Sequence, residues 1–561
     1  MIEITQIDGL MLREMVLAGT ALLERNREKV DALNVFPVPD GDTGTNMSLT
    51  MASAVREINA KEYTSASEAA AALAKGALRG ARGNSGVITS QLYRGFSRAL
   101  EGVDAITPMQ FAQALKKGAD TAYKAVMRPK EGTILTVARV IAEEAVRQAE
   151  ENPDSYEELF NTIISSGEAI LERTPDMLPV LKQAGVVDAG GRGLLLIYTG
   201  YKAALSGEPI ETAETEDAAK QTANKAEGEA VFKDSKYTYG VRYSIINIGK
   251  KAVQSDIDLL KRQLNRIGDC LSIDGDLKRL SVTVQTNDPG KALQYGQILG
   301  DLTDMELLNL KDQASSQGSA DESEHAIASA EATGDQAAAE TEDKKYGMIA
   351  VSLGEGFSRI FKDLGIDAIV EGGQTMNPSI EDLQRAIDNV HAETVFVFPN
   401  NGNVILAAQQ AAQICDSHVL VIPTKNVAMG IAASVAFQPD LSPEENEQRM
   451  LEAAENVRTA TITYAVRDSE FEALHIKQGD IIGLHNGKVS RVGCNVHDVS
   501  VQLTNDIVTD DDSLITLYYG EETKKEDADK LAEELADIYP DCDVDVQYGG
   551  QPLYYYLIAV E

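Results

Sequence analysis

The first 205 residues carry apolar positions three and four residues apart, which is the period of an amphipathic helix. Near the start this spacing is followed by Leu12, Met15, Val16, Leu22 and Leu23. Segments rich in Ala, Leu, Glu and Lys, which favour helices, recur at 49–60, 66–80, 108–126, 133–150, 156–173 and 190–205. The pattern predicts an all-helical domain over residues 1–205.

Two further patterns follow along the chain. Residues 231–311 contain the strand-like runs YTYGVRYSIINI and RLSVTVQT around the helical SDIDLLKRQLNRI, which predicts a small α+β domain. Residues 346–561 begin with four short apolar runs, MIAVSL, DAIVEG, TVFVFP and HVLVIP, separated by helical segments such as EDLQRAIDNV. Strands that are apolar throughout are buried on both faces, so we expect an α/β domain with a parallel sheet covered by helices on both sides. After about residue 445, short strands and the helical EDADKLAEELADIY predict a terminal α+β lobe.

Two acidic segments separate these domains. Residues 208–230 hold seven acids and two bases, and residues 312–343 hold nine acids and no Lys or Arg. Few large apolar residues occur in either, so we predict flexible linkers at 206–230 and 312–345. Because both linkers intervene, we expect the C-terminal domain not to complete a ligand site on the first domain.

The length and net charge of the chain exclude some classes of protein. At 561 residues the chain is long enough for three or four domains of about 150 residues each. Its formal net charge of −37 disfavours nucleic acid as a partner. No apolar run approaches the ~18 residues of a membrane-spanning helix. The opening MIEITQID also lacks the layout of a signal peptide, so we expect a cytoplasmic protein.

A loop rich in turn residues and carboxylates lies at 34–47, NVFPVPDGDTGTNM. Its prolines and glycines exclude a helix, and it gathers Asp40, Asp42 and Asn46 around Thr43. One interpretation is purely structural, with these residues forming a turn and a helix N-cap. The other is a binding loop for a ligand or metal.

A second loop, GARGNSGVITSQ at 80–91, is rich in glycine and precedes a helix. Gly80, Gly83 and Gly86 allow backbone N–H groups to approach an anion, and Asn84 and Ser85 add side-chain donors. The alternative is that these glycines permit close helix packing. A third loop, AGVVDAGGRG at 184–193, offers Asp188 and Arg192 in a similar setting.

The first domain can bind a metal only through oxygen. Histidine is absent before His325 and cysteine before Cys270, so hard ligands for magnesium, manganese or calcium remain. Clustered carboxylates beside glycine-rich loops are typical of phosphoryl transfer. The Walker A, EF-hand and protein-kinase patterns are not met, so a different nucleotide-binding fold is expected.

Several motifs together resemble a known family. NVFPVPDGDTGTNM, RGNSGVITSQ, EGTILTV (131–137) and AGVVDAGGRG are similar to the nucleotide-binding domain of DhaL-type dihydroxyacetone kinases. EGGQTMNPS (371–379), FPNNGN (398–403), VIPTK (421–425) and TYAVRD (463–468) extend the resemblance to fatty acid kinase catalytic subunits of the FakA or YloV type. It covers essentially the whole chain apart from the linkers.

The resemblance implies an N-terminal antiparallel helical barrel that binds ATP through Mg²⁺. Asp40 and Asp42 would hold the metal, with Asn34, or alternatively Asp31, as a further ligand. The catalytic residues would be Asp40, Asp42 and Arg192. ATP would be bound by Thr43, Asn46, Gly83, Asn84, Ser85, Gly86, Thr133 and Asp188.

The reaction implied is phosphorylation of a fatty acid carboxylate to an acyl phosphate. The fatty acid would be presented by a DegV-like fatty-acid-binding protein, docked on the C-terminal domain near the turns at 372–377 and 399–403. A carboxylate is already a nucleophile at pH 7, so positioning and charge neutralisation suffice without a general base. A homodimer is expected. Two alternatives stay open, a non-catalytic nucleotide-sensing scaffold and a kinase of a small hydroxy-ketone of the dihydroxyacetone type.

The middle domain departs from the family pattern. Where relatives carry cysteine and a His-x-His pair, this chain has Gly240, Thr283 and Gln285, which cannot replace thiolate and imidazole ligands. We therefore predict no zinc in the middle domain and expect it to be a structural or dimerising spacer.

Overall fold

The computed structural model describes residues 6–34, 41–207, 239–246, 254–276, 279–297, 299–309, 344–373, 376–465, 469–471, 474–485 and 487–561. The chain forms two compact units, one made of Met1–Thr212 with Glu340–Glu561 and the other of Ala213–Ala339. Nearly all of the predicted linkers 206–230 and 312–345 lie outside the described residues.

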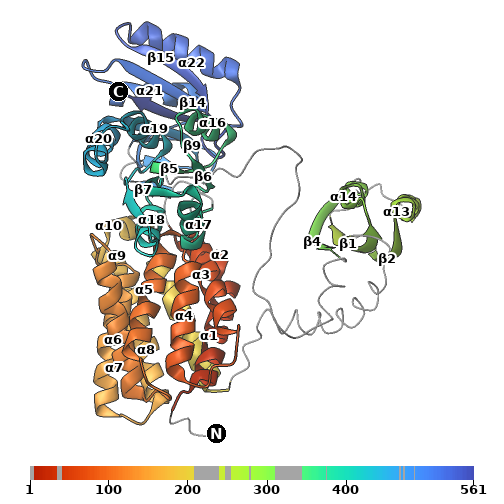
Figure 1. Cartoon of the computed structure of the whole chain (residues 1–561), viewed down its shortest axis with the longest axis vertical. Helices are drawn as coiled ribbons and strands as arrows, with labels where there is room; N and C mark the ends of the chain where they lie inside the picture. The colour runs from red at the N-terminus through yellow and green to blue at the C-terminus, as the bar shows by residue number, and fades with distance from the viewer. Residues whose placement is uncertain are drawn as a thin grey trace. The chain divides into compact units, whose positions relative to one another are not determined.

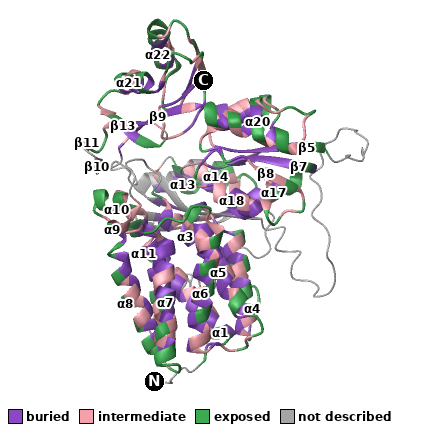
Figure 2. Cartoon of the chain, turned by 90° about the vertical axis from the view of Figure 1, so that its left-hand side faces the viewer, coloured by how far each residue is buried: buried purple, intermediate pink, exposed green. Residues whose placement is uncertain are grey.

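The N-terminal part of the larger unit is all helical, which confirms the prediction from apolar spacing (Figure 1). Consecutive long helices pack side by side in chain order, and the last of them returns to contact the first. Buried residues lie on their inward faces (Figure 2). The long helices are α1 Gly9–Arg25, α3 Thr43–Ile58, α4 Ala66–Arg79, α5 Gly83–Ala99, α6 Pro108–Ala125, α7 Ile134–Glu151, α8 Tyr156–Leu171 and α11 Ala189–Leu205. The short ones are α2 Arg27–Leu33, α9 Thr174–Met177 and α10 Pro179–Ala184.

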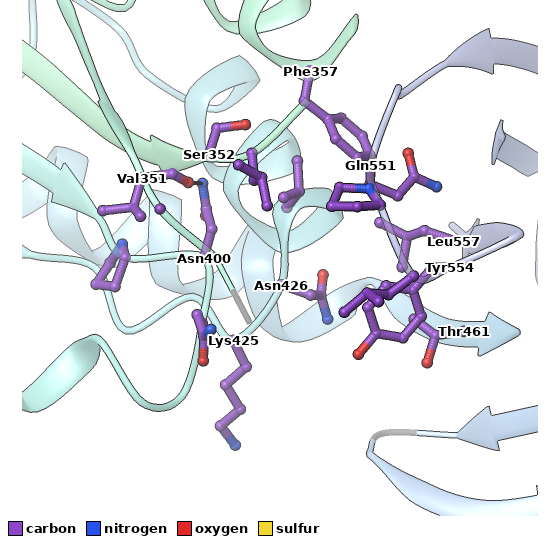
Figure 3. A pocket seen from close by; sticks show the side chains of 18 residues that line it. Val351, Ser352, Phe357, Asn400, Lys425, Asn426, Thr461, Gln551, Tyr554 and Leu557 are labelled. Atoms are coloured by element: carbon purple, nitrogen blue, oxygen red, sulfur yellow. Dashed lines mark hydrogen bonds between the residues drawn. The ribbon is translucent and has the colours of Figure 1, made fainter. Parts of the chain in front are cut away.

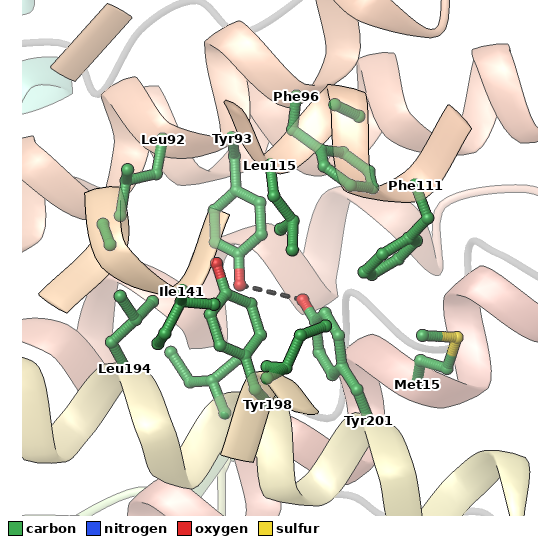
Figure 4. Packing of buried hydrophobic residues seen from close by; sticks show 14 of the residues in the cluster. Met15, Leu92, Tyr93, Phe96, Phe111, Leu115, Ile141, Leu194, Tyr198 and Tyr201 are labelled. Carbon is green, nitrogen blue, oxygen red and sulfur yellow. Dashed lines mark hydrogen bonds between the residues drawn. The ribbon is translucent and has the colours of Figure 1, made fainter. Parts of the chain in front are cut away.

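Aromatic residues fill the middle of this helical domain. The rings of Phe96 and Phe111 meet edge to face, with centroids 5.3 Å apart. The hydroxyl groups of Tyr93 and Tyr201 face each other and share a hydrogen bond of 2.8 Å (Figure 4). Both side chains are buried, so this pairing avoids the cost of unsatisfied polar groups in the core.

The smaller unit is α+β, as its pattern predicted. Four antiparallel strands lie in the order β2-β3-β1-β4, and apolar residues such as Val241, Tyr243 and Val282 pack against Leu260 and Leu264 of a helix. Its elements are β1 Tyr239–Ile246, α13 Gln254–Ile267, β2 Gly268–Asp276, β3 Arg279–Thr286, α14 Pro289–Gln297 and β4 Asp301–Asn309. Strand pairing places Gly240 opposite Gln285. The absence of zinc there stays a prediction.

The C-terminal part of the larger unit begins with the predicted parallel sheet, in the order β6-β5-β7-β8. Ile349 and Val351 of β5 pack against α17 and α18, while Met348 and Ala350 face α16, α19 and α20. Helices therefore cover both faces, as expected. The bounds are β5 Lys344–Ser352, α16 Glu355–Asp363, β6 Ala368–Glu371, α17 Ile380–Val390, β7 Ala392–Phe398, α18 Ile405–Ala412, β8 His418–Val421, α19 Val427–Val435 and α20 Pro443–Asn456.

A six-stranded sheet in the order β13-β12-β9-β16-β14-β15 forms the terminal lobe, with two helices packed on it. The sequence pattern predicted α22 but not α21. The stretch that forms α21 is rich in Val, Asn, Asp and Thr, which favour strands or turns, and packing overrides that preference. The elements are β9 Arg458–Tyr464, β10 Ser469–Phe471, β11 Leu474–Ile476, β12 Ile481–His485, β13 Lys488–Gly493, α21 Val496–Ile507, β14 Leu514–Tyr519, α22 Lys525–Ile538, β15 Asp543–Tyr548 and β16 Tyr556–Val560.

Candidate active site

Four helices of the N-terminal domain begin close together. α3 and α5 are in contact, and so are α3 and α11, and α7 and α11. A Cβ at Gly193, in the first turns of α11, would lie 2.7 Å from the Met47 Sδ near the start of α3. A Cβ at Gly190 would lie 3.1 Å from the Cβ of Ile134, the first residue of α7. Helix N-termini present unpaired N–H groups and a partial positive charge, so this end of the domain favours an anion.

Asp42 is the N-cap residue of α3, and its carbonyl oxygen accepts a hydrogen bond of 2.7 Å from the Asn46 N–H, but its side chain makes no capping hydrogen bond. Its Oδ2 instead accepts a hydrogen bond of 2.6 Å from the Asn377 Nδ2 of the C-terminal domain. Thr43 and Asn46 follow on α3 and are buried. Asp40 lies outside the described residues. Asp42 is therefore the N-cap residue by position, while its carboxylate faces the boundary between two domains.

Asp31 and Asn34, at the end of α2, lie close to residues at the start of α3. The Asp31 carboxylate accepts hydrogen bonds from the Thr45 backbone N–H at 3.0 Å and from its hydroxyl at 2.8 Å. Asn34 ends α2, and its carbonyl oxygen would lie 3.7 Å from a Cβ at Gly41. Asp31 thus anchors the start of α3, while Asn34 lies near Gly41, the residue before Asp42.

The glycine-rich loop approaches the same place. Gly83 has a φ of +57°, and a Cβ there would lie 2.5 Å from the Asn46 Nδ2 and 3.3 Å from the Asn377 Nδ2. At Gly86 a Cβ would lie 2.3 Å from the Thr50 Oγ1 on α3. Gly86 is therefore needed for close packing of α5 on α3, whereas Gly83 gives room to two side-chain amides.

Residues around this loop bind the C-terminal domain. Arg82 donates a hydrogen bond of 2.8 Å to the Asn377 carbonyl oxygen, and its guanidinium lies 3.3 Å from the Asp382 carboxylate. Burial opposes the charge on Asp382, but hydrogen bonds from Ser379 and the nearby Arg82 hold its pKa below the usual value. Asn84 donates to the Asn403 Oδ1 at 3.0 Å. Ser85 continues the first turn of α5 and is partly buried.

The expectation that the C-terminal domain stays away from these loops is wrong. Ala81 and Val87 share one apolar cluster with Ile380 and Leu383 of α17, and Ile380 N donates to the Ala81 carbonyl at 3.1 Å. Linker length sets how far two domains can separate, but packing of their surfaces decides whether they do.

The sequence analysis did not identify Arg82, Asn377 and Asp382 as site residues. The quoted motifs RGNSG and EGGQTMNPS contain two of them.

Thr133, Asp188 and Arg192 form a neighbouring group with structural partners of their own. Asp188 caps α11 by accepting from Gly191 N at 2.7 Å. Burial raises the pKa of Asp188 to about 6, although hydrogen bonds from the Gly191 and Ile134 N–H groups act in the opposite direction. Arg192 pairs with Glu168 at 2.7 Å, and the Thr133 hydroxyl donates to the Lys130 carbonyl oxygen.

A hard cation fits the donor set at Asp42. In the described part of the chain, no three His, Cys, Asp or Glu residues lie close enough together to hold a metal ion. The Asn377 Oδ1 is nevertheless buried without a hydrogen-bond partner among the described atoms, next to the Asp42 carboxylate. Amide and carboxylate oxygens are suitable ligands for Mg²⁺.

The carboxyl ends of the parallel strands border a separate cavity of about 90 Å³. Val351 and Asn400 line it from the sheet, and Gln551 and Leu557 line it from the terminal lobe (Figure 3). The turns at 372–377 and 399–403 were expected to dock a carrier, but each turn contacts two different parts of the molecule. Their first residues border this cavity, whereas Asn377 and Asn403 contact the helical domain.

Comparisons with known proteins agree with this architecture. Residues 37–203 match the DAK2 domain, 236–317 the middle domain of FakA-like fatty acid kinase proteins, and 347–561 their C-terminal domain. Protein YloV of Bacillus subtilis is 39% identical over 564 residues, covering 100% of both chains. An uncharacterized Staphylococcus saprophyticus protein is 38% identical over 563 residues, again covering 100% of both.

One solved structure with a local likeness is a DegV family protein from Corynebacterium glutamicum, at 16% identity. It covers 39% of this chain and 97% of its own, with a TM-score of 0.32, from which no common fold is inferred. No helix in the described ranges is long and apolar enough to cross a membrane. Full-length similarity to YloV, together with the three domain matches, shows that the chain belongs to the FakA-like family of fatty acid kinase proteins and carries an N-terminal DAK2 domain.

Proposed function

We propose that the protein uses ATP and Mg²⁺ to phosphorylate a fatty acid carboxylate and release an acyl phosphate. Family membership supports a kinase, and the observation that carries the proposal is the meeting of Asp42 and Asn377 at the starts of α3 and α5. The start of α11 packs on α3, and the start of α7 packs on α11. A positive helix end beside a carboxylate that can hold a cation suits a triphosphate with its metal.

In this proposal the phosphates lie against the starts of α3 and α5. Backbone N–H groups from Gly83 to Ser85 and the side chains of Thr43, Asn46, Asn84 and Ser85 donate to phosphate oxygens, with Thr133 and Asp188 bordering the nucleotide. The Gly86 N–H donates instead to the Arg82 carbonyl oxygen, and Gly86 lets α5 approach α3 closely. Asp40, Asp42 and Asn34 hold Mg²⁺, and the Asn377 Oδ1 is a further candidate ligand. When bound, the metal neutralises charge on the β- and γ-phosphates.

The chemical step needs no base from the protein. A carboxylate oxygen of the fatty acid attacks the γ-phosphorus, and the bond from that phosphorus to the bridging oxygen of ADP breaks. The electron pair leaves with ADP, so the products are acyl phosphate and ADP. Arg192 would stabilise the transferred group after exchanging its pairing with Glu168.

The acceptor is proposed to arrive on a DegV-like fatty-acid-binding protein. Because the C-terminal domain already contacts Asp42 and Asn84, a carrier docked on that domain would be held near the γ-phosphate. A homodimer and a cytoplasmic location complete the proposal, as predictions from the sequence.

Two alternatives remain, a nucleotide-sensing scaffold and a kinase of a small hydroxy-ketone. ADP release should be measured with ATP and Mg²⁺ alone, with fatty acid, with fatty acid plus a DegV-like protein, and with dihydroxyacetone. We expect ADP release that depends on fatty acid and is increased by the carrier. ADP release with dihydroxyacetone alone would favour the hydroxy-ketone kinase, and no turnover with tight ATP binding would favour the scaffold.

A further inference from the structure

A polar cavity of about 700 Å³ lies between the helical domain and the parallel-sheet domain, away from the Asp42 loop. α5 and α6 form one wall, and α18, β8 and a residue of α20 form the other. Four cations line the helical wall: Arg94 and Arg98 on α5, and Lys117 and Lys124 on α6. Arg94 and Arg98 are one helical turn apart, and Lys117 and Lys124 are two turns apart. The two cations of each helix therefore lie on the same face of that helix.

These four cations lack counterions within the described part of the chain. Elsewhere in the same domain, Arg13, Arg27 and Lys75 each pair with a carboxylate. No ion pair to a described residue involves the four cations of the cavity, whose one acidic lining residue is Glu447. Burial and the neighbouring Arg98 lower the pKa of Arg94. Arg98, Lys117 and Lys124 are exposed and Arg94 is half-buried, so the four cations are open to an anion from solvent.

We propose that this cavity binds a small, multiply charged anion that carries phosphate or carboxylate groups. Its volume suits a metabolite-sized ligand, and cations from two neighbouring helices of one wall can contact such an anion at several points. The Gln413 amide, at the end of α18, adds a neutral donor from the other domain. An anion bound here would hold the two domains together.

The cavity is distinct from the proposed nucleotide site. Apart from Gln91, the last residue of the 80–91 segment, it shares no lining residue with the loops at Asp42 and Gly83. Arg94 lies about 16 Å along α5 from Gly83, at the helical rise of about 1.5 Å per residue. The inference therefore does not rest on the proposed kinase activity.

The test is titration of the full chain with inorganic pyrophosphate, without Mg²⁺ and at constant ionic strength, followed by calorimetry and thermal melting. The wild type should bind pyrophosphate and melt at a higher temperature with it. Arg94→Gln combined with Lys117→Gln should weaken binding by about tenfold or more. The matched control is Lys477→Gln combined with Lys488→Gln, which removes two exposed lysines from the terminal lobe and should bind normally.

A second measurement separates binding from misfolding. Without anion and at low salt, the Arg94→Gln and Lys117→Gln double variant should melt at or above the wild-type temperature, because repulsion among the cations is relieved. Equal losses in both double variants would show only a diffuse charge effect and overturn the site. Binding of an acidic polypeptide such as polyglutamate, with none of pyrophosphate, would overturn a small-anion ligand, and so would no binding by the wild type.

Discussion

The Asn377 side-chain amide donates a hydrogen bond of 2.6 Å to the Asp42 carboxylate, although the two residues are 335 positions apart. One belongs to the turn before α17 and the other to the loop before α3. The proposed metal-binding carboxylate is therefore positioned by the C-terminal domain. This contact makes the C-terminal domain part of the proposed nucleotide site.

Asn377→Ala should lower turnover at least tenfold while leaving the helical domain folded. The substitution removes the donor to Asp42 and a candidate oxygen ligand, and a hydrogen bond to a charged group contributes about 1.5–3 kcal/mol. Steady-state kinetics at varied Mg²⁺ measure the effect, which should include a weaker apparent affinity for the metal. Asn403→Ala is the control, since Asn403 bonds the exposed Asn84 at the same domain boundary. Equal activity of the two variants would contradict the role of Asn377.

Asp42→Ala should abolish phosphoryl transfer, with loss well beyond tenfold, because each ~1.4 kcal/mol of lost transition-state stabilisation is a factor of ten in rate. Asp40→Ala should behave in the same way. Circular dichroism and thermal melting should stay near wild type, since Asp42 does not belong to the apolar core of the helical domain. Wild-type turnover with unchanged melting in both variants would remove the metal assignment.

Gly83 and Gly86 should respond differently to alanine. Gly83→Ala places a methyl group against the Asn46 and Asn377 amides at a positive φ, so ATP affinity should fall. Gly86→Ala places it 2.3 Å from the Thr50 Oγ1, so thermal stability should fall first. The double variant Gly86→Ala with Thr50→Ala should recover part of that stability. Normal ATP affinity in Gly83→Ala would mean that this glycine serves packing alone.

The free energy of unfolding should change with pH because the Asp188 carboxyl group has a raised pKa in the folded protein. Its pKa is about 6 in the folded protein against 3.8 ordinarily, so the folded state binds more protons between these values. Its contribution to stability is fully present below pH 3.8 and is lost as pH rises towards 6. The full shift corresponds to roughly 3 kcal/mol, and the partial exposure of Asp188 makes the expected effect smaller.

Asp188→Asn keeps an oxygen that can accept from Gly191 N and removes the charge. Denaturant unfolding of both proteins from pH 4 to 8 should show the variant gaining stability relative to the wild type as pH rises. A constant difference across that range would show that Asp188 does not titrate there.

The sequence predicted those features that depend on local pattern. Composition rich in Ala, Leu, Glu and Lys in segments such as 108–126 and 133–150 located helices α6 and α7, and the apolar runs MIAVSL and TVFVFP located the central parallel strands. The pattern did not predict α21, whose several valines form a helix because its apolar face packs on the terminal sheet.

The contact between Asp42 and Asn377 could not be predicted in this way. No local spacing links residues so distant in the chain, and the acidic linkers suggested separation instead. The motif that contains Asn377 was noticed, but its contact with Arg82 depends on docking of two folded surfaces. The sequence also could not show that Gly86 is required for helix packing. A glycine required for packing and a glycine required for ligand binding look the same in a sequence.

The most direct test of the proposed reaction is detection of its product. Full-length protein would be incubated with ATP, Mg²⁺, a fatty acid and a DegV-like fatty-acid-binding protein, and hydroxylamine would trap any acyl phosphate as the hydroxamate. We predict hydroxamate in amounts equal to the ADP released by the wild type, and none above background with Asp42→Ala. ADP release without hydroxamate, or equal hydroxamate from both proteins, would contradict the account.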